Sequence, residues 1–207
     1  MARGRLRQEL TNLPNLLTYA RIATIPLILW FVEHDSPVNC CWAALIYSIA
    51  SVTDVLDGFL ARLSGQVSMI GKFIDPLADK LIVLLLFVYL IPLGRIPPWV
   101  VVVVLTRELA VTGLRAIAAG EGLIISASDS AKMKTSFQLI GCVGLLLHYR
   151  YTLDLYFTEV DASFHDLGLA FTYMSLVLSV WSGFRYFRAF VQAVIDREEA
   201  PKNQAPR

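Results

Sequence analysis

The stretch DVLDGFLARLSGQVSMIGKFIDPLAD, residues 54–79, carries four aspartates in otherwise apolar surroundings. Side chains on a helix advance by about 100° per residue. On that basis, one narrow stripe of a first helix carries four of these residues: Asp54, Asp57, Gly58 and Ala61. One face of a second helix carries three more, spaced at i, i+4 and i+8: Gly71, Asp75 and Asp79. Two neighbouring helices can therefore direct four carboxylates into one pocket beside small residues.

The rest of the chain is strongly apolar. Of its 207 residues, 56% are hydrophobic and 17% are charged, and the mean hydropathy is +0.59. A soluble domain has about 25% charged residues. Intrinsic disorder is excluded by this composition, and the net charge of +1 excludes a nucleic-acid binder that relies on its whole surface. The apolar runs predict six membrane-spanning helices near residues 13–33, 37–63, 69–93, 97–119, 132–151 and 164–190.

These segments predict an all-α integral membrane protein with a single domain over residues 1–207. Residues 2–10 are predicted to form a short amphipathic juxtamembrane helix that lies on the inner membrane surface. The tail over residues 200–207 is predicted to be mobile. The alternative is a soluble helical bundle, but six such segments leave too little polar surface to cover a soluble body.

Basic residues gather on one side of the predicted helices. Lysine and arginine dominate both termini and the connections after the second and fourth helices, whereas the other connections are mainly acidic. By the positive-inside rule, both termini and the aspartate-bearing helix ends face the cytoplasm. The acidic, aromatic loop over residues 152–166 then lies on the outer side, and no role is assigned to it.

The four aspartates need neutralising partners. A charge deep in a bilayer costs at least about 2.5–3.5 kcal/mol, so four unpaired carboxylates would cost on the order of 10 kcal/mol, which is comparable with the stability of a whole domain. An all-oxygen site suits the hard cations Mg²⁺ or Mn²⁺, and two such ions would cancel the four negative charges. The absence of a side chain at Gly58 would let a bulky ligand approach the backbone.

The aspartates and the glycines beside them are also compatible with three different roles. The aspartates could be paired structurally with Arg62, Lys72 and Lys80. They could also form the cation path of a transporter. Gly58 and Gly71 could serve helix packing, as small residues do in membrane proteins, and this role is compatible with a metal site.

Residues 54–79 follow the pattern Asp-x-x-Asp-Gly-x-x-Ala-Arg, eight residues, and then Gly-x-x-x-Asp-x-x-x-Asp. This pattern resembles the signature of the CDP-alcohol phosphotransferase family, and all eight fixed positions are filled. The resemblance implies a six-helix membrane fold, a homodimer and a CDP-linked lipid substrate. It also implies two divalent cations, Mg²⁺ or Mn²⁺, as cofactors.

Residues 12–21, 75–80 and 106–135 resemble the bacterial branch of this family. That branch transfers the phosphatidyl group of CDP-diacylglycerol to glycerol 3-phosphate and releases CMP, which implies an enzyme of phospholipid synthesis in the bacterial inner membrane. One position departs from the branch: Ala131 stands where a glycine usually precedes the first lysine. The alternatives are another acceptor alcohol, such as inositol phosphate, serine or a lipid, and, more remotely, a cation transporter.

The resemblance also implies roles for individual residues. The metal ligands would be Asp54, Asp57, Asp75 and Asp79. Asp79 would in addition be the catalytic base, taking the proton of the attacking hydroxyl. The CDP portion would be held by five residues: Asp54, Gly58, Ala61, Arg62 and Gly71.

The acceptor pocket is predicted from charge, because glycerol 3-phosphate is a dianion and needs a basic site. Cations and one hydroxyl gather near the cytoplasmic half of the fourth predicted helix and the loop after it: Arg107, Arg115, Lys132, Lys134 and Thr135. Glu108 is expected to orient Arg107 or Arg115. The alternative is that these cations only anchor the helices on the inner side of the membrane.

Overall fold

The computed structural model describes residues 13–64, 69–123, 130–155 and 158–199. Within these ranges only the backbone is described for residues 13–18, 54–64, 69–79, 130–132, 152–155, 158–160 and 198–199. The described chain forms helices and one hairpin in this order: α2 (Leu13–Glu33), α3 (Pro37–Ser64), α4 (Met69–Leu90), α5 (Pro98–Gly120), α6 (Ser130–Leu147), β1 (Arg150–Leu155), β2 (Thr158–Ser163) and α7 (Phe164–Glu199).

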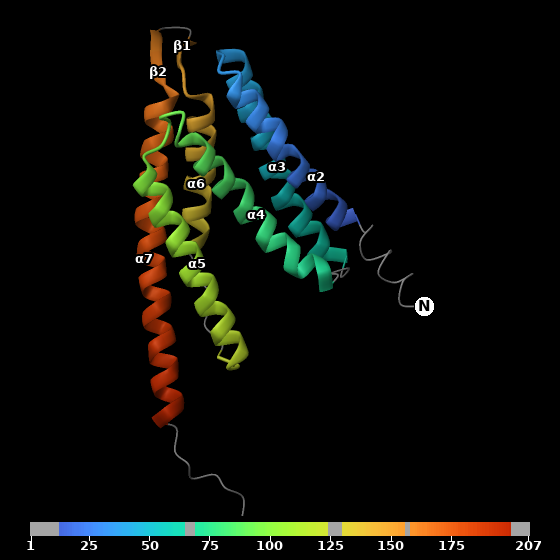
Figure 1. The fold of residues 1–207 in the computed structure, drawn as a ribbon, viewed down its shortest axis with the longest axis vertical. Coiled ribbons are helices and arrows are strands. Elements are labelled where there is room, and N and C mark those ends of the chain that lie inside the picture. Colours follow the sequence, from blue (N-terminus) through green and yellow to red (C-terminus); the bar gives the residue numbers. More distant parts are fainter. Residues whose placement is uncertain (1–12, 65–68, 124–129, 156–157, 200–207) are drawn as a thin grey trace, which may run out of the picture.

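A helix lies at each of the six positions where the sequence predicts one. Figure 1 shows α2 and α3 paired on one side of the molecule and α6 and α7 side by side on the other, with α4 crossing between them. The predicted juxtamembrane helix over residues 2–10 and the tail over residues 200–207 lie outside the described residues.

The prediction of an all-α chain is wrong between residues 150 and 163. Here β1 and β2 pair antiparallel, with Arg150 opposite Ser163 and Leu155 opposite Thr158. Helix α6 ends at Leu147 because His148 adopts a left-handed backbone conformation with φ of 55°, which an α-helix cannot continue. The segment that the sequence predicted on the outer side is therefore, in its described residues, largely a hairpin, and it lies above α6 and α7 in Figure 1.

The buried core joins α2, α3, α4, α5, α6 and α7. Most of its apolar side chains come from α2 to α6, with Leu176 from α7, and the largest that are fully buried include Ile28, Tyr47, Phe87, Val100 and Leu145. Large apolar side chains also cover much of the outer surface: Trp30, Trp42, Leu109, Val177 and Trp181 are all at least half exposed. An apolar exterior of this extent is unusual for a soluble protein, and it is what a lipid-facing surface requires.

One helix in the described part of the chain, over Phe164–Arg197, is both long and apolar enough to cross a membrane. Shorter apolar helical stretches occupy Pro37–Thr53, Lys80–Leu90 and Met133–Leu147. By length and composition the described residues therefore provide one clear membrane-spanning helix, and six spanning helices remain a prediction.

A buried arginine ties the connections at one end of the bundle together. Arg95 is 1% exposed, and its Nη2 donates to Asp35 Oδ1 at 2.5 Å, while its Nη1 donates to the carbonyl of Leu146 at 3.1 Å. The hydroxyl of Tyr149 donates to the same carboxylate oxygen at 3.1 Å. One guanidinium group therefore links three segments by hydrogen bonds: the α2–α3 connection, the α4–α5 connection and the end of α6.

Helices α6 and α7 approach each other closely enough that only glycine fits at their contact. A Cβ at Gly144 would lie 2.6 Å from the Cα of Gly168, and a Cβ at Gly168 would lie 2.5 Å from the backbone nitrogen of Leu145. A Cβ at Gly141 would lie 2.6 Å from Thr172 Oγ1. Small residues are the usual means by which membrane helices reach such a separation.

Gly144→Ala is expected to lower the free energy of unfolding by about 1–3 kcal/mol, because the added methyl meets backbone atoms that cannot move aside. Gly113→Ala on α5 is the matched control, since nothing lies within 4 Å of the Cβ it would add. That change should be neutral or stabilising by up to about 1 kcal/mol. Thermal unfolding in detergent measures both. Equal effects of the two substitutions would contradict the close α6–α7 contact.

Candidate active site

The aspartates of residues 54–79 lie on α3 and α4, on either side of the short connection between these helices. Asp54 and Asp57 belong to the C-terminal part of α3, and Asp75 and Asp79 to the N-terminal part of α4. Their side chains lie outside the described part of the structure. The same is true of the predicted CDP-binding residues Gly58, Ala61, Arg62 and Gly71, so the structure places these residues on their helices only.

A charged cluster around Glu108 includes Lys80, the residue that directly follows this stretch in the sequence. The side chain of Glu108 is buried, with 8% of the residue exposed, and it belongs to α5. Glu108 Oε1 accepts from Arg107 Nη1 at 2.8 Å and from Lys134 Nζ. Glu108 Oε2 lies 3.7 Å from Nζ of Lys80, the residue that follows Asp79. One carboxylate thus faces cations from α4, α5 and α6.

A cavity of about 250 Å³ opens beside this cluster. It lies between α4, α5 and α6, and its lining is Lys80, Val83, Leu84, Glu108, Lys134, Thr135 and Gln138. Charged and amide side chains meet apolar ones here, which is typical of a site that binds a small polar molecule.

Arg107 is held mainly by α7. Its Nε donates to the carbonyl of Ser179 at 2.8 Å and its Nη2 donates to Ser182 Oγ at 2.6 Å. A Cβ at Gly183 would lie 3.4 Å from Arg107 Cγ, so the glycine leaves room for the arginine stem against α7. The prediction that Glu108 orients Arg107 or Arg115 is confirmed for Arg107.

Of the other predicted acceptor-site residues, two line the cavity, one does not, and one has no described side chain. Lys134 and Thr135 line the cavity, Lys134 as a buried residue and Thr135 as an exposed one. Arg115 is exposed and its guanidinium lies over the ring of Tyr186, 5.5 Å from the ring centre. The side chain of Lys132 lies outside the described residues.

Two polar residues of the cavity lining were not predicted as site residues from the sequence. Lys80 is the last residue of the DPLADK stretch, and its ammonium group donates to Thr112 Oγ1 at 2.7 Å. Gln138 is buried and lies one helical turn after Lys134, on the same face of α6. The i, i+4 spacing of Lys134 and Gln138 is a signal that could have identified the second residue.

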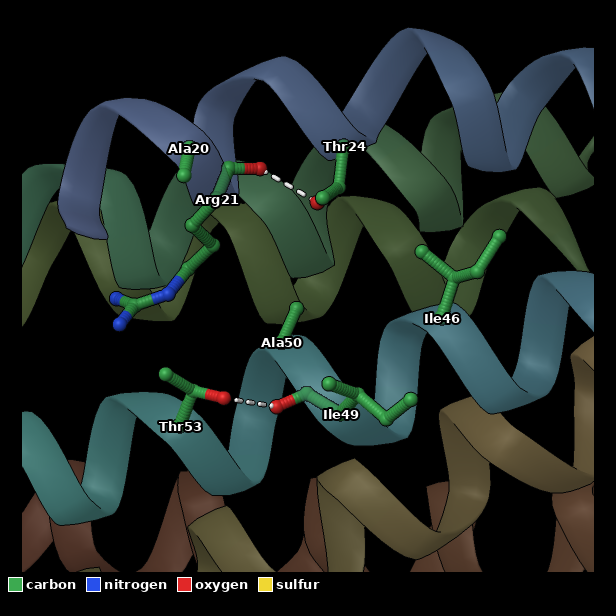
Figure 2. Close-up of a pocket in the computed structure, with 7 residues that line it drawn as sticks. All are labelled: Ala20, Arg21, Thr24, Ile46, Ile49, Ala50 and Thr53. Carbon is green, nitrogen blue, oxygen red and sulfur yellow. Dashed lines mark hydrogen bonds between the residues drawn. The ribbon is translucent and has the colours of Figure 1, made fainter. Parts of the chain in front are cut away.

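A second opening, of about 270 Å³, lies between α2 and α3 (Figure 2). Its lining is almost entirely apolar and consists of Ala20, Arg21, Thr24, Ile46, Ile49, Ala50 and Thr53. Figure 2 shows the guanidinium of Arg21 at one end of this groove, on the side of Thr53. Thr53 immediately precedes Asp54, so the groove ends next to the aspartate-bearing part of α3.

Arg107→Lys is expected to lower the free energy of unfolding by about 1–3 kcal/mol, because one ammonium group cannot replace donors directed at Ser179, Ser182 and Glu108. The control is Arg188→Lys, where the guanidinium lies 6.0 Å from the ring centre of Phe184 on an exposed part of α7. Thermal unfolding should show a small change for the control. An Arg107→Lys variant that unfolds at the same temperature as the wild type would refute the anchoring of α5 to α7 through this side chain.

Comparison with known proteins places the chain in a family. The sequence profile described as CDP-alcohol phosphatidyltransferase matches residues 11–181. The chain is 39% identical to a Bacillus subtilis protein, 34% identical to one from Rickettsia bellii and 28% identical to one from Cereibacter sphaeroides, and each is named CDP-diacylglycerol–glycerol-3-phosphate 3-phosphatidyltransferase. These matches cover 85%, 86% and 86% of this chain and 93%, 94% and 94% of the relatives. The chain belongs to the CDP-alcohol phosphatidyltransferase family.

Proposed function

We propose that this protein transfers the phosphatidyl group of CDP-diacylglycerol to glycerol 3-phosphate, giving phosphatidylglycerol phosphate and CMP. The observation that carries the proposal is the cavity lined by Lys80 and Lys134, one wall of which is formed by α4, the helix that bears Asp75 and Asp79. The charge of this cavity suits an acceptor that carries a phosphate. The names of the relatives, which match over most of their length, support the same reaction.

In the proposed reaction, the acceptor hydroxyl oxygen forms a bond to the phosphatidyl phosphorus. The bond from that phosphorus to the bridging oxygen breaks, and CMP leaves with the bond electrons. Asp79 takes the proton of the hydroxyl as the general base. Positioning and charge neutralisation, more than covalent chemistry, are what such a transfer requires from a protein.

We propose that Asp54, Asp57, Asp75 and Asp79 hold two divalent cations. The donor set fits, because carboxylate oxygens are the preferred ligands of Mg²⁺ and Mn²⁺, and the residues belong to adjoining parts of α3 and α4. Among the described side chains no other group of three or more potential metal ligands lies together. When bound, the ions would neutralise the diphosphate of the lipid substrate. The CDP portion is assigned to Asp54, Gly58, Ala61, Arg62 and Gly71.

The acceptor phosphate is assigned to Lys134 and Thr135 in the cavity. Positive charge on the same, predicted cytoplasmic side of the membrane comes from Arg107, Arg115 and Lys132. A basic site favours a dianion over a neutral alcohol, because three cations face the single carboxylate of Glu108 and a neutral acceptor adds no negative charge beside them. This preference distinguishes glycerol 3-phosphate from serine within the family. A cation transporter has no need of a pocket with excess positive charge.

The proposal includes a multi-pass topology in the bacterial inner membrane, with the termini and the active site facing the cytoplasm and a homodimer as the assembly. The apolar exterior and the spanning helix at Phe164–Arg197 support the lipid environment. The apolar groove between α2 and α3 suits the hydrocarbon part of the lipid substrate, because it ends beside Asp54.

The reaction is tested by incubating purified protein with CDP-diacylglycerol, Mg²⁺ or Mn²⁺, and a panel of alcohols that includes glycerol 3-phosphate, inositol phosphate and serine. CMP is expected to appear only with glycerol 3-phosphate, and a chelator should abolish its release. Release with a different alcohol would change the acceptor assignment. Full activity in the presence of the chelator would overturn the metal site.

Asp79→Asn is expected to reduce CMP release by about 10²–10⁴-fold, the usual contribution of general-base catalysis, while CDP-diacylglycerol still binds. The control is Asp196→Asn, because this exposed residue on α7 contacts Gln192 far along the chain from the signature. It should leave the rate unchanged. An Asp79→Asn variant with more than about a tenth of the wild-type rate would remove Asp79 from the role of base.

A further inference from the structure

We propose that Glu108 is a positioning residue, whose carboxylate holds the ammonium groups of Lys80 and Lys134 together at the wall of the cavity so that both bind the acceptor phosphate. The inference rests on the proposed function, since it concerns how that reaction recognises its acceptor. It adds Lys80 to the phosphate-binding residues and gives Glu108 a role of its own.

The geometry of the carboxylate supports this role. Its two oxygens divide the cations between them: Oε1 accepts from Lys134 and Arg107, and Oε2 faces Lys80. The three cations come from three helices, so no single helix spacing brings them together. Both lysines and the glutamate line the same cavity.

Lys80 is positioned from two points on α5. Its Nζ donates to Thr112 Oγ1 at 2.7 Å and lies 3.7 Å from Glu108 Oε2. Thr112 follows Glu108 by four residues and shares its face of the helix. The ammonium group is therefore placed by one face of α5, although Lys80 itself belongs to α4.

Arg107 acts on the other side of the carboxylate. Its Nε and Nη2 are directed at α7, and its Nη1 donates to Glu108. Arg107 therefore fixes the carboxylate against α5 and α7. The described residues that line the cavity do not include Arg107. We infer that it contributes to acceptor binding through Glu108.

The charge of the cluster matches the acceptor. Among these four side chains three are basic and one is acidic, an arrangement that suits a phosphate monoester, which carries a charge of −2. Without the carboxylate, three cations would repel one another in a site where Lys134 is only 7% exposed. With it, the two lysines are already close together before substrate arrives, which lowers the free-energy cost of ordering them on binding.

A purely structural role accounts for the cluster less well. Buried ion pairs are weak contributors to stability, because desolvation offsets most of their attraction, and apolar side chains of similar volume often replace them without loss. A cluster with excess positive charge that borders a cavity is better accounted for by the binding of an anion there.

The test compares Glu108→Gln and Glu108→Asp in steady-state CMP release with both substrates varied. Glu108→Gln is expected to raise the KM for glycerol 3-phosphate at least about 10-fold, while the KM for CDP-diacylglycerol stays within about 2-fold. Glu108→Asp keeps the charge and should be less impaired than Glu108→Gln. Glu121→Gln is the matched control, because this exposed glutamate directly after α5 pairs with Arg197 away from the cavity.

Stabilisation by glycerol 3-phosphate provides a second readout that needs no turnover. Added glycerol 3-phosphate should raise the melting temperature of the wild type and of Glu121→Gln, and should have a much smaller effect on Glu108→Gln. Lys80→Met is expected to show the same loss of response. If Glu108→Gln does not fold, Lys80→Met and Glu108→Asp decide the matter by the same two measurements.

Three results would overturn the inference: an unchanged KM for glycerol 3-phosphate in the folded variants, equal increases in both KM values, or a Gln variant more active than the Asp variant. The wild-type assay separates this inference from the proposed function. A wild type that releases no CMP with glycerol 3-phosphate refutes the function itself. An active wild type with insensitive Glu108 and Lys80 variants refutes only the positioning role.

Discussion

The buried carboxylate of Glu108 holds the arrangement of the candidate site together. Three cations reach it from α4, α5 and α6, and one of them, Arg107, carries the connection on to α7. Four helices are thus coupled through one side chain in surroundings of low polarity. An ionic contact there is hard to exchange for water, so removing the carboxylate leaves uncompensated buried charge.

A second ionic contact, in which the arginine is buried and the aspartate is half exposed, joins helices beyond the other end of α5. Arg95 joins Asp35 to the end of α6, next to the hairpin, while the segments between the two charged clusters are apolar. Among the described side chains, two of the places where charge is buried, at Arg95 and at Glu108, are therefore places where separate helices are joined. A low overall charged fraction makes each of them informative, because burying a charge is too costly to occur without a partner.

The positions of all the helices in the described chain could be predicted from apolar runs, since such runs reflect burial against protein or lipid whatever the neighbours are. The hairpin and the end of α6 could not. They depend on the left-handed backbone at His148 and on pairing between β1 and β2, and neither has a strong periodic signal in residues 148–163. The role of the glycines at 141, 144 and 168 could not be predicted either, because it depends on how closely α6 packs against α7.

The family can be recognised without coordinates, because the eight fixed residues of 54–79 match the signature of the family, and their spacing also predicts that they share helix faces. The grouping of the cations cannot be inferred in this way. Lys80, Glu108 and Lys134 are distant in sequence, so no local spacing shows that they meet. Arg107 and Arg115 are both basic residues of α5, but Arg107 contacts Glu108 and Ser179, whereas Arg115 lies over the ring of Tyr186. Charge composition shows how many basic residues face one side, whereas their pairing depends on how the helices pack.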